Sequence, residues 1–214
     1  YRREEVIGKT IPELFLPPEW IPIVQKRFAD PYAPEVRAPH ENPWRTKSGE
    51  ERLIEWRCTV FPSPVDGSPH ILGTGIDISE RKLAEERLRL QSAALEAAAN
   101  AIIITDHEGM IVWANPAFTA LTGYSHTEVV GRNPRELVKS GEQNQLFYKD
   151  LWDTILAGKV WRGQIINRRK DGSVYTEEMT ITPLRNEQGK ISRFIAIKQD
   201  ITERKRAEQA LLDS

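Results

Sequence analysis

One block of sequence occurs twice in this chain at a constant spacing. Residues 77–82 read DISERK, and residues 200–205, 123 positions later, read DITERK. The same spacing, with no gap, aligns further identical residues far upstream: Gly8 with Gly131, Leu14 with Leu137, Arg45 with Arg168, Lys47 with Lys170, Gly49 with Gly172 and Glu55 with Glu178. A period this long indicates a duplicated domain, because solenoid repeats run to about 20–50 residues.

The spacing also predicts where the two copies lie. We expect a first domain over 1–78, a helical linker over 79–97, a second domain over 98–201 and the start of a C-terminal helix over 202–214. Tyr1 aligns with Tyr124, so the first copy is expected to lack its first strands. Both ends of the sequence are therefore expected to continue into a longer protein.

Composition excludes several classes of function. Lys and Arg total 30 against 31 Asp and Glu, so the bulk charge does not indicate a nucleic-acid surface. The single cysteine, Cys58, excludes a disulfide framework and a C-x-x-C metal or redox pair, and the four His residues are too scattered to predict a metal site. No apolar run reaches the roughly 18 residues of a membrane span. The single cysteine fits a reducing compartment, so we expect a cytoplasmic protein, with membrane attachment of the parent chain upstream left open.

The second copy predicts a mixed α+β domain. Two short β-branched runs flank a turn at Gly109, a capping box begins at Ser125, and an amphipathic helix follows over 146–156. Three more strands are predicted over 160–168, 174–184 and 191–199, with an Asp-Gly turn between the first two. The order predicts a five-stranded antiparallel sheet with short helices on one face, where a pocket can form.

The segment between the copies predicts one continuous helix, since residues 79–97 contain no Gly or Pro. A 4-3-4-3 spacing of mostly apolar residues runs along it, formed by Ala84, Leu88, Gln91, Leu95 and Ala98. This spacing is typical of a coiled-coil seam, which would make the protein a homodimer. An amphipathic linker that docks on its own domain explains the same pattern.

Five motifs together resemble the PAS domain family, with its PAC-type C-terminal half present in both copies. They are 114–118 (ANPAF), 121–124 (LTGY), 128–134 (EVVGRNP), 167–172 (NRRKDG) and 200–205 (DITERK). The resemblance implies two PAS domains in tandem, the first incomplete at its N-terminus. It further implies a sensory input module of a bacterial signal-transduction protein, such as a two-component system, with a histidine kinase or diguanylate cyclase output elsewhere in the parent chain.

The repeated ending predicts an ion pair at each junction between sheet and helix. An Asp that closes the last strand lies four residues before an Arg in the first helical turn. Asp77 with Arg81, and Asp200 with Arg204, are the predicted pairs. Such a pair would couple the geometry of the sheet to the exit angle of the helix, and is otherwise an exposed ion pair worth about 0–1 kcal/mol.

Two cofactor classes known among PAS domains do not fit the second copy. The light-sensing subclass forms a flavin adduct through a cysteine after Gly-Arg-Asn, and this chain has Pro134 in that place. Haem-binding members need an axial ligand, usually His on the long helix, and residues 146–156 contain none. Adduct photochemistry is therefore excluded, and haem is not expected.

A third subclass binds FAD without a covalent bond and senses redox state, and the second copy is similar to it over 131–172. The resemblance implies that Trp152 packs beside the isoalloxazine ring and that Asn167 bonds its polar edge. Asn133, Trp161 and Gln199, the last if its side chain faces inward, complete the expected cofactor set. Such sensors can place a polar residue on the first strand and an acidic residue after Gly-x-Asn, whereas this chain has Ile103 and Pro134 there.

Other functions remain open at the level of sequence. The second domain could bind a different small ligand, or serve as a ligand-free dimerisation or relay scaffold. A flavin enzyme is the third alternative, but the chain has no Gly-rich phosphate loop and no Ser/His/Asp or Cys/His set, so no enzymatic activity is expected for it. The first copy has Trp44 in place of Asn167, which removes the expected flavin contact there.

Overall fold

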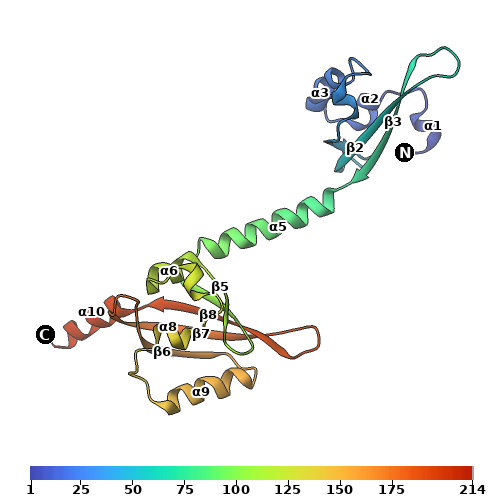
Figure 1. The fold of residues 1–214 in the computed structure, drawn as a ribbon. Coiled ribbons are helices and arrows are strands. Elements are labelled where there is room, and N and C mark those ends of the chain that lie inside the picture. The colour runs from blue at the N-terminus through green and yellow to red at the C-terminus, as the bar shows by residue number, and fades with distance from the viewer. Residues whose placement is uncertain (214) are drawn as a thin grey trace. The chain divides into compact units, whose positions relative to one another are not determined.

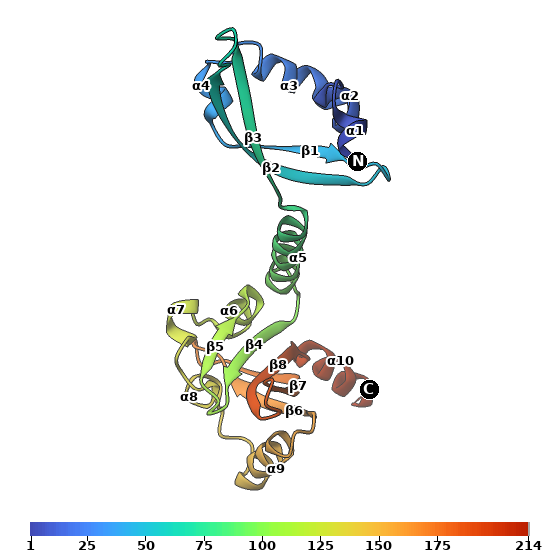
Figure 2. The same cartoon turned by 90° about the vertical axis from the view of Figure 1, so that its right-hand side faces the viewer.

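The computed structural model describes residues 1–213, and the chain divides into two compact units, Tyr1–Arg89 and the part from Leu90 onward. Each unit contains its own antiparallel sheet, as Figures 1 and 2 show. The boundary between the units falls within one helix, α5 (Ser79–Glu96).

The second unit contains a five-stranded antiparallel sheet with the order β5-β4-β8-β7-β6. The final strand along the chain, β8, therefore lies in the middle and pairs with both β4 and β7. The strands are β4 (Ala101–Asp106), β5 (Ile111–Ala114), β6 (Trp161–Arg168), β7 (Val174–Arg185) and β8 (Ile191–Asp200). The α+β fold and the five-stranded sheet are as the sequence predicts.

Four helices between β5 and β6 cover one face of this sheet: α6 (Pro116–Thr122), α7 (His126–Val129), α8 (Pro134–Val138) and α9 (Gln145–Leu156). The hydrophobic core lies between them and the sheet, because alternate strand residues point to this face. Phe118 of α6 and Ile155 of α9 pack there with Ile103 and Phe194 of the sheet. The expected capping box is present, with Ser125 and Glu128 closing the first turn of α7.

The first unit contains a three-stranded sheet, β1 (His40–Arg45), β2 (Glu51–Pro62) and β3 (Pro69–Asp77), in the order β1-β2-β3. Short helices precede it: α1 (Arg3–Val6), α2 (Ile11–Phe15), a 3₁₀ turn (Pro18–Trp20), α3 (Ile21–Arg27) and α4 (Pro34–Arg37). The residues of β3 are exposed, and among residues 1–213 no strand pairs with its second edge. A second PAS domain here stays a prediction.

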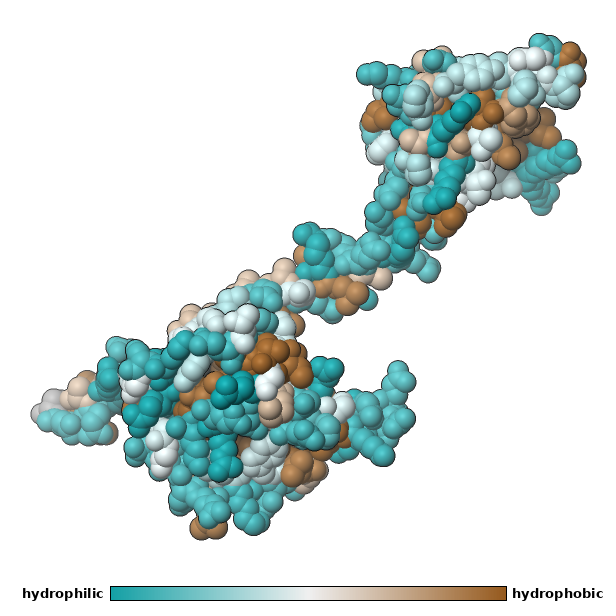
Figure 3. Space-filling view, in the orientation of Figure 1, coloured by the Kyte–Doolittle hydropathy of each residue, from teal (hydrophilic) through white to brown (hydrophobic). Residues whose placement is uncertain are grey.

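Two helices follow directly on the last strands of the two sheets, α5 after β3 and α10 (Thr202–Leu212) after β8. The continuous helix expected over 79–97 is confirmed, although Ala98 lies beyond its end. No residue of α5 is buried, and its leucines 83, 88, 90 and 95 are exposed. Figure 3 shows hydrophobic side chains interrupting an otherwise hydrophilic surface along this helix. The dimer seam stays a prediction.

Candidate ligand-binding site

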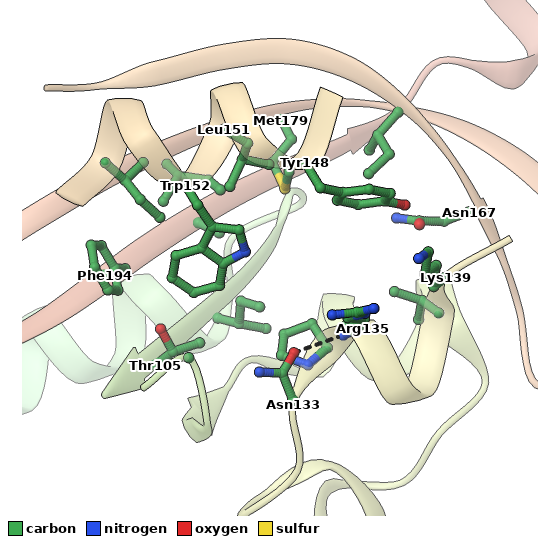
Figure 4. Close-up of a pocket in the computed structure, with 18 of the residues that line it drawn as sticks. Thr105, Asn133, Arg135, Lys139, Tyr148, Leu151, Trp152, Asn167, Met179 and Phe194 are labelled. Carbon is green, nitrogen blue, oxygen red and sulfur yellow. Dashed lines mark hydrogen bonds between the residues drawn. The ribbon is translucent and has the colours of Figure 1, made fainter. Parts of the chain in front are cut away.

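A cavity of about 680 Å³ lies under the helices of the second unit. The inward side chains of the sheet form one wall, and α8 and α9 form the other (Figure 4). Its apolar lining consists of Ile103, Val138, Leu151, Ile155, Ile165, Met179, Ile181, Phe194 and Ala196. Ligand pockets for small molecules typically have volumes of about 300–1,000 Å³ and such an apolar lining.

Aromatic side chains line the α9 side of the cavity. Tyr148 and Trp152 are four residues apart on α9 and therefore lie on the same helix face. The Trp152 ring meets Phe194 edge to face, with the ring centroids 6.1 Å apart. Gly109 makes room for this ring: its φ is +85°, and a Cβ atom there would lie 3.0 Å from Trp152 Cη2. A flat molecule could therefore lie against Trp152.

Three buried polar side chains from neighbouring strands meet at one end of the cavity; we call Asn167, Glu177 and Lys198 the polar floor. Asn167 Nδ2 donates to Glu177 Oε1 at 3.0 Å, and Lys198 Nζ donates to the same oxygen. Asn167 and Lys198 line the cavity, whereas Glu177 is fully buried behind them. Glu177 thus holds the Asn167 amide so that its oxygen is free to accept from a ligand, while Lys198 keeps N–H groups to donate.

Tyr175 extends the polar floor away from the cavity. Its side chain is 1% exposed, and its hydroxyl has no hydrogen-bond partner. Burial, together with the negative charge of Glu177, raises the pKa of Tyr175 well above its usual range. The guanidinium carbon of Arg169 lies 4.3 Å from the Tyr175 ring centroid. This stacking contact connects the polar floor to a charged group outside the core.

Cationic side chains surround the α8 side of the cavity. Arg135, Lys139 and Lys149 all line it, and Lys139 Nζ lies 4.7 Å from the centre of the Tyr148 ring. Asn133 caps α8 by accepting from the Arg135 backbone N–H at 3.0 Å, as Figure 4 shows. The cavity can therefore accommodate a ligand that has a planar apolar body and a negatively charged group.

Three of the five residues expected to bind a cofactor line the cavity, namely Trp152, Asn167 and Asn133. Gln199 is exposed, because β8 places Lys198 on the cavity face and the next residue on the opposite face. Trp161 is buried outside the cavity: its ring lies over Gly163 and meets Phe147 edge to face at 5.5 Å. Neither Gln199 nor Trp161 is therefore placed to touch a ligand there.

Sequence reasoning missed Glu177 and Lys198. A signal was present on β8, since inward positions 194 and 196 are apolar and Lys198 continues the same alternation. Glu177 follows Tyr175 on β7 in the same way. A lysine and a glutamate in register with core residues on neighbouring strands indicate a buried ion pair.

The predicted junction pairs are wrong. Asp200 accepts from Arg169 Nη2 at 2.7 Å and from the Thr202 N–H at 2.9 Å, whereas Arg204 lies 3.9 Å from Glu178 and Glu208. The carboxylate turns toward the first amides of α10 because they have no partner within the helix. Partial burial opposes ionisation, but the bonds from Thr202 and Arg169 outweigh it and lower the pKa of Asp200.

The first unit shows the same departure at its own junction. Asp77 accepts from the Ser79 N–H at 2.9 Å and lies 3.5 Å from Arg52, and this backbone hydrogen bond lowers the pKa of Asp77. Arg81 lies instead 3.4 Å from Glu55. In both units the Asp therefore accepts from the first backbone N–H of the following helix.

A second cavity, of about 470 Å³, lies in the first unit, but its polar floor is absent. At the positions of Asn167, Glu177 and Lys198, 123 residues earlier, this unit has Trp44, Ile54 and Gly75. The rings of Trp44 and Trp56 pack 4.5 Å apart, and Phe15 stacks on Trp44. Neither charge of the polar floor therefore has a counterpart in the first unit, where Ile54 and Gly75 replace Glu177 and Lys198 and an aromatic ring, Trp44, replaces Asn167.

Comparisons with known proteins agree with this geometry for the second unit. Residues 99–203 match the PAS domain family. They form one PAS domain. PAS domains are sensory and regulatory modules. The crystal structure of a PAS domain from Colwellia psychrerythraea shares the fold, with a TM-score of 0.51 and 23% identity, over 55% of this chain and 98% of that one.

Two curated relatives are regulators. The nitrogen fixation regulatory protein of Klebsiella oxytoca is 38% identical over 129 residues, which cover 60% of this chain and 26% of that protein. The bacterioopsin transcriptional activator of Halobacterium salinarum is 34% identical over 141 residues, covering 64% of this chain and 21% of its own length. The chain thus spans about a quarter or less of the length of these relatives. The similarity to regulators supports a signal-sensing role for its PAS domain.

Two absences hold for the residues described. No helix within residues 1–213 is long and apolar enough to cross a membrane. The same residues contain no group of three or more His, Cys, Asp or Glu side chains that could hold a metal ion.

Proposed function

We propose that the PAS domain of residues 99–203 holds a flavin, with FAD as the cofactor, and senses redox state through it. The observation that carries this proposal is the cavity itself, with an aromatic wall at Trp152 and the polar floor of Asn167 and Lys198 at one end. The resemblance of residues 131–172 to FAD-binding redox sensors supports it. The signal then passes through α10 to an output domain.

The residues present fit a flavin. The cavity is large enough for a flat tricyclic ring, and Trp152 offers a face for it. The free oxygen of Asn167 and the N–H groups of Lys198 match the alternating acceptors and donor of the ring's imide edge. Arg135 and Lys139 line the α8 side and suit the phosphates. When bound, a flavin would supply reversible electron transfer.

A contiguous set of contacts connects the polar floor to α10. Glu177 lies beside Tyr175, Arg169 stacks on the Tyr175 ring, and the same guanidinium donates to Asp200. Thr202, the first residue of α10, also accepts from the Thr176 N–H at 2.9 Å through its hydroxyl. A change in charge at the cavity would therefore reach both hydrogen bonds that position the start of α10. Transmission requires two states of this junction that the oxidised and reduced ligand favour differently.

The parent protein is proposed to be a homodimeric sensor of the histidine kinase or diguanylate cyclase type. Leu88 and Leu95 of α5, seven residues apart on the expected seam and both exposed, support dimerisation. The regulatory relatives support an output domain elsewhere in the parent chain. The cavity and sheet of the first unit support a second, PAS-like fold there, with different ligand chemistry.

An absorption spectrum tests the proposal. Residues 1–214 would be purified without added cofactor, and again after incubation with FAD. We expect the two bands of oxidised flavin, which dithionite bleaches and air restores, and we expect Trp152→Leu and Asn167→Leu to weaken flavin binding. Trp161→Leu is the matched control, because this ring lies outside the cavity. A protein that binds no flavin under either condition would contradict the proposal.

A ligand-free relay is the second candidate, favoured by the exposed apolar residues of α5. In that case the protein would dimerise through α5, and substitution of Leu88 by Asp would give a monomer, whether or not a flavin is present. Sedimentation equilibrium with and without FAD separates the two functions. A monomeric protein that binds FAD supports the sensor and excludes the scaffold.

A further inference from the structure

The two charged residues of the polar floor lie at different depths from the cavity. Lys198 lines the cavity, although its side chain is only 3% exposed. Its partner Glu177 has no exposed surface and lies behind it, bonded through Oε1 to both Lys198 and Asn167. A molecule in the cavity therefore meets the positive end of this pair first.

Few other charges reach this end of the cavity. Arg135, Lys139 and Lys149 line the cavity from α8, its end and α9, and Lys149 is paired with Asp153. Arg169 and Asp200 form their own pair outside the core, each with a side chain about a quarter to a third exposed. Solvent screens these groups more than it screens Lys198, because screening is weakest for buried charges.

We propose that the Lys198–Glu177 pair sets the redox potential of the flavin, with Lys198 raising it and Glu177 lowering it. This inference rests on the proposed function. Reduction at neutral pH adds two electrons and one proton to the ring, and so leaves one negative charge. An ammonium close to the ring stabilises that charge, and the more distant carboxylate opposes it, so the pair as a whole favours the reduced form.

The electrons come from an external low-potential donor, which is dithionite in the assay. On reoxidation both electrons, the ring proton and one proton from solvent pass to dioxygen, and hydrogen peroxide leaves. The pair exchanges no electron in either direction; Lys198 and Glu177 act through charge alone.

Three variants test the proposal: Lys198→Gln, Glu177→Gln and the double variant. Glutamine keeps hydrogen-bonding groups at each position but removes the charge. The predicted order of midpoint potentials, from highest to lowest, is Glu177→Gln, wild type, double variant, Lys198→Gln. Each single substitution should change the ratio of affinities for reduced and oxidised flavin at least tenfold, which is about 30 mV for a two-electron couple. Lys190→Gln is the control, because it removes an exposed cation of the same unit that does not line the cavity, and it should change the ratio less than threefold.

The outcomes separate this inference from the function on which it rests. Failure of the wild-type protein to hold a flavin contradicts both. Flavin binding with Lys198→Gln at or above the wild-type potential, or Glu177→Gln at or below it, overturns the charge effect alone. If Lys198→Gln does not fold, the double variant takes its place, since it has no unpaired charge, and its potential must fall below the wild-type value.

Discussion

The buried pair of Lys198 and Glu177 makes a quantitative prediction about stability in the absence of any ligand. Both side chains are almost fully removed from solvent, at 3% and 0% exposure. Removal of one partner leaves the other charge buried and uncompensated, which costs about 3–5 kcal/mol. A domain of this size has a free energy of unfolding of only about 5–15 kcal/mol. Either Lys198→Gln or Glu177→Gln should therefore remove a large part of the stability of the second unit.

The double variant should recover much of this loss. With both charges gone, no ion remains in the core, and replacement of a buried ion pair by neutral groups is often close to neutral in free energy. The two single costs should therefore be strongly non-additive, with a coupling energy of about 2 kcal/mol or more. Asn167 Nδ2 still has a glutamine oxygen to donate to at position 177, so the rest of the polar floor can persist.

Urea denaturation of the whole chain measures the four free energies. Both substitutions lie in the second unit, so the unfolding of the first unit serves as an internal reference. Lys149→Gln with Asp153→Asn is the matched cycle, since this ion pair is four residues apart on α9 and largely exposed. Its coupling should be about 0.3–0.5 kcal/mol. The reasoning would be refuted if the losses in free energy of unfolding at Lys198 and Glu177 were additive and no larger than those of the exposed pair. Lys198 and Glu177 would then not depend on each other for their burial.

Three further predictions concern single positions. Asp200→Ala removes the acceptor of the Thr202 N–H and should cost about 0.5–1.5 kcal/mol, the net contribution of a typical hydrogen bond. It should leave flavin affinity unchanged while it loosens α10, which hydrogen exchange of the first helical turn measures. Because folding lowers the pKa of Asp200, its contribution to the free energy of unfolding is present above the unfolded pKa of about 3.9 and is lost as pH falls. The difference in free energy of unfolding between wild type and variant should therefore be smaller at about pH 3 than at about pH 6. A difference that stays constant would contradict this. Gly109→Ala should cost more than the roughly 1–2 kcal/mol of a positive φ, because its Cβ would meet Trp152, and should weaken flavin binding. Gly189→Ala is the control, because Gly189 has a φ of +76° and open space around it, so that the substitution carries the backbone cost alone. Equal effects of Gly109→Ala and Gly189→Ala on flavin affinity would count against the contact between residue 109 and Trp152. Tyr175→Phe removes a buried hydroxyl that has no partner and should change the free energy of unfolding by less than about 1 kcal/mol; a loss above about 2 kcal/mol would mean that the hydroxyl is bonded in solution.

The fold of the second unit followed from local signals in the sequence. Alternating strand residues, the Ser125 capping box and the glycine turns each specify their own short segment, and all agree with one sheet. The cavity residues Trp152 and Asn167 were also accessible, through the family resemblance. These features depend on residues close to one another in the chain or on motifs of fixed spacing.

The errors arose where the outcome depends on contacts between distant segments. Gln199 was expected in the cofactor set if its side chain faces inward, but the direction of each side chain on β8 is set by pairing with β4 and β7, which turns Lys198 inward instead. Sequence spacing paired Asp200 with Arg204. Its partner in the structure is Arg169, which lies 31 residues earlier, in the turn between β6 and β7. Short spacing in sequence gave the wrong partner, because the unpaired amides at the start of α10 compete for the same carboxylate.

The two units share their junction but not their polar floor. The Thr176 N–H donates to the Thr202 hydroxyl at 2.9 Å, and 123 residues earlier the Leu53 N–H donates to the Ser79 hydroxyl at 2.8 Å. At the position of Lys198, by contrast, the first unit has Gly75, where a Cβ atom would lie 2.7 Å from both Trp56 and Ile54. A lysine could enter there only if the Trp56 ring left. The same attachment of sheet to helix therefore accompanies two cavities of different chemistry, and at this position only the second unit places a charged side chain beside its cavity.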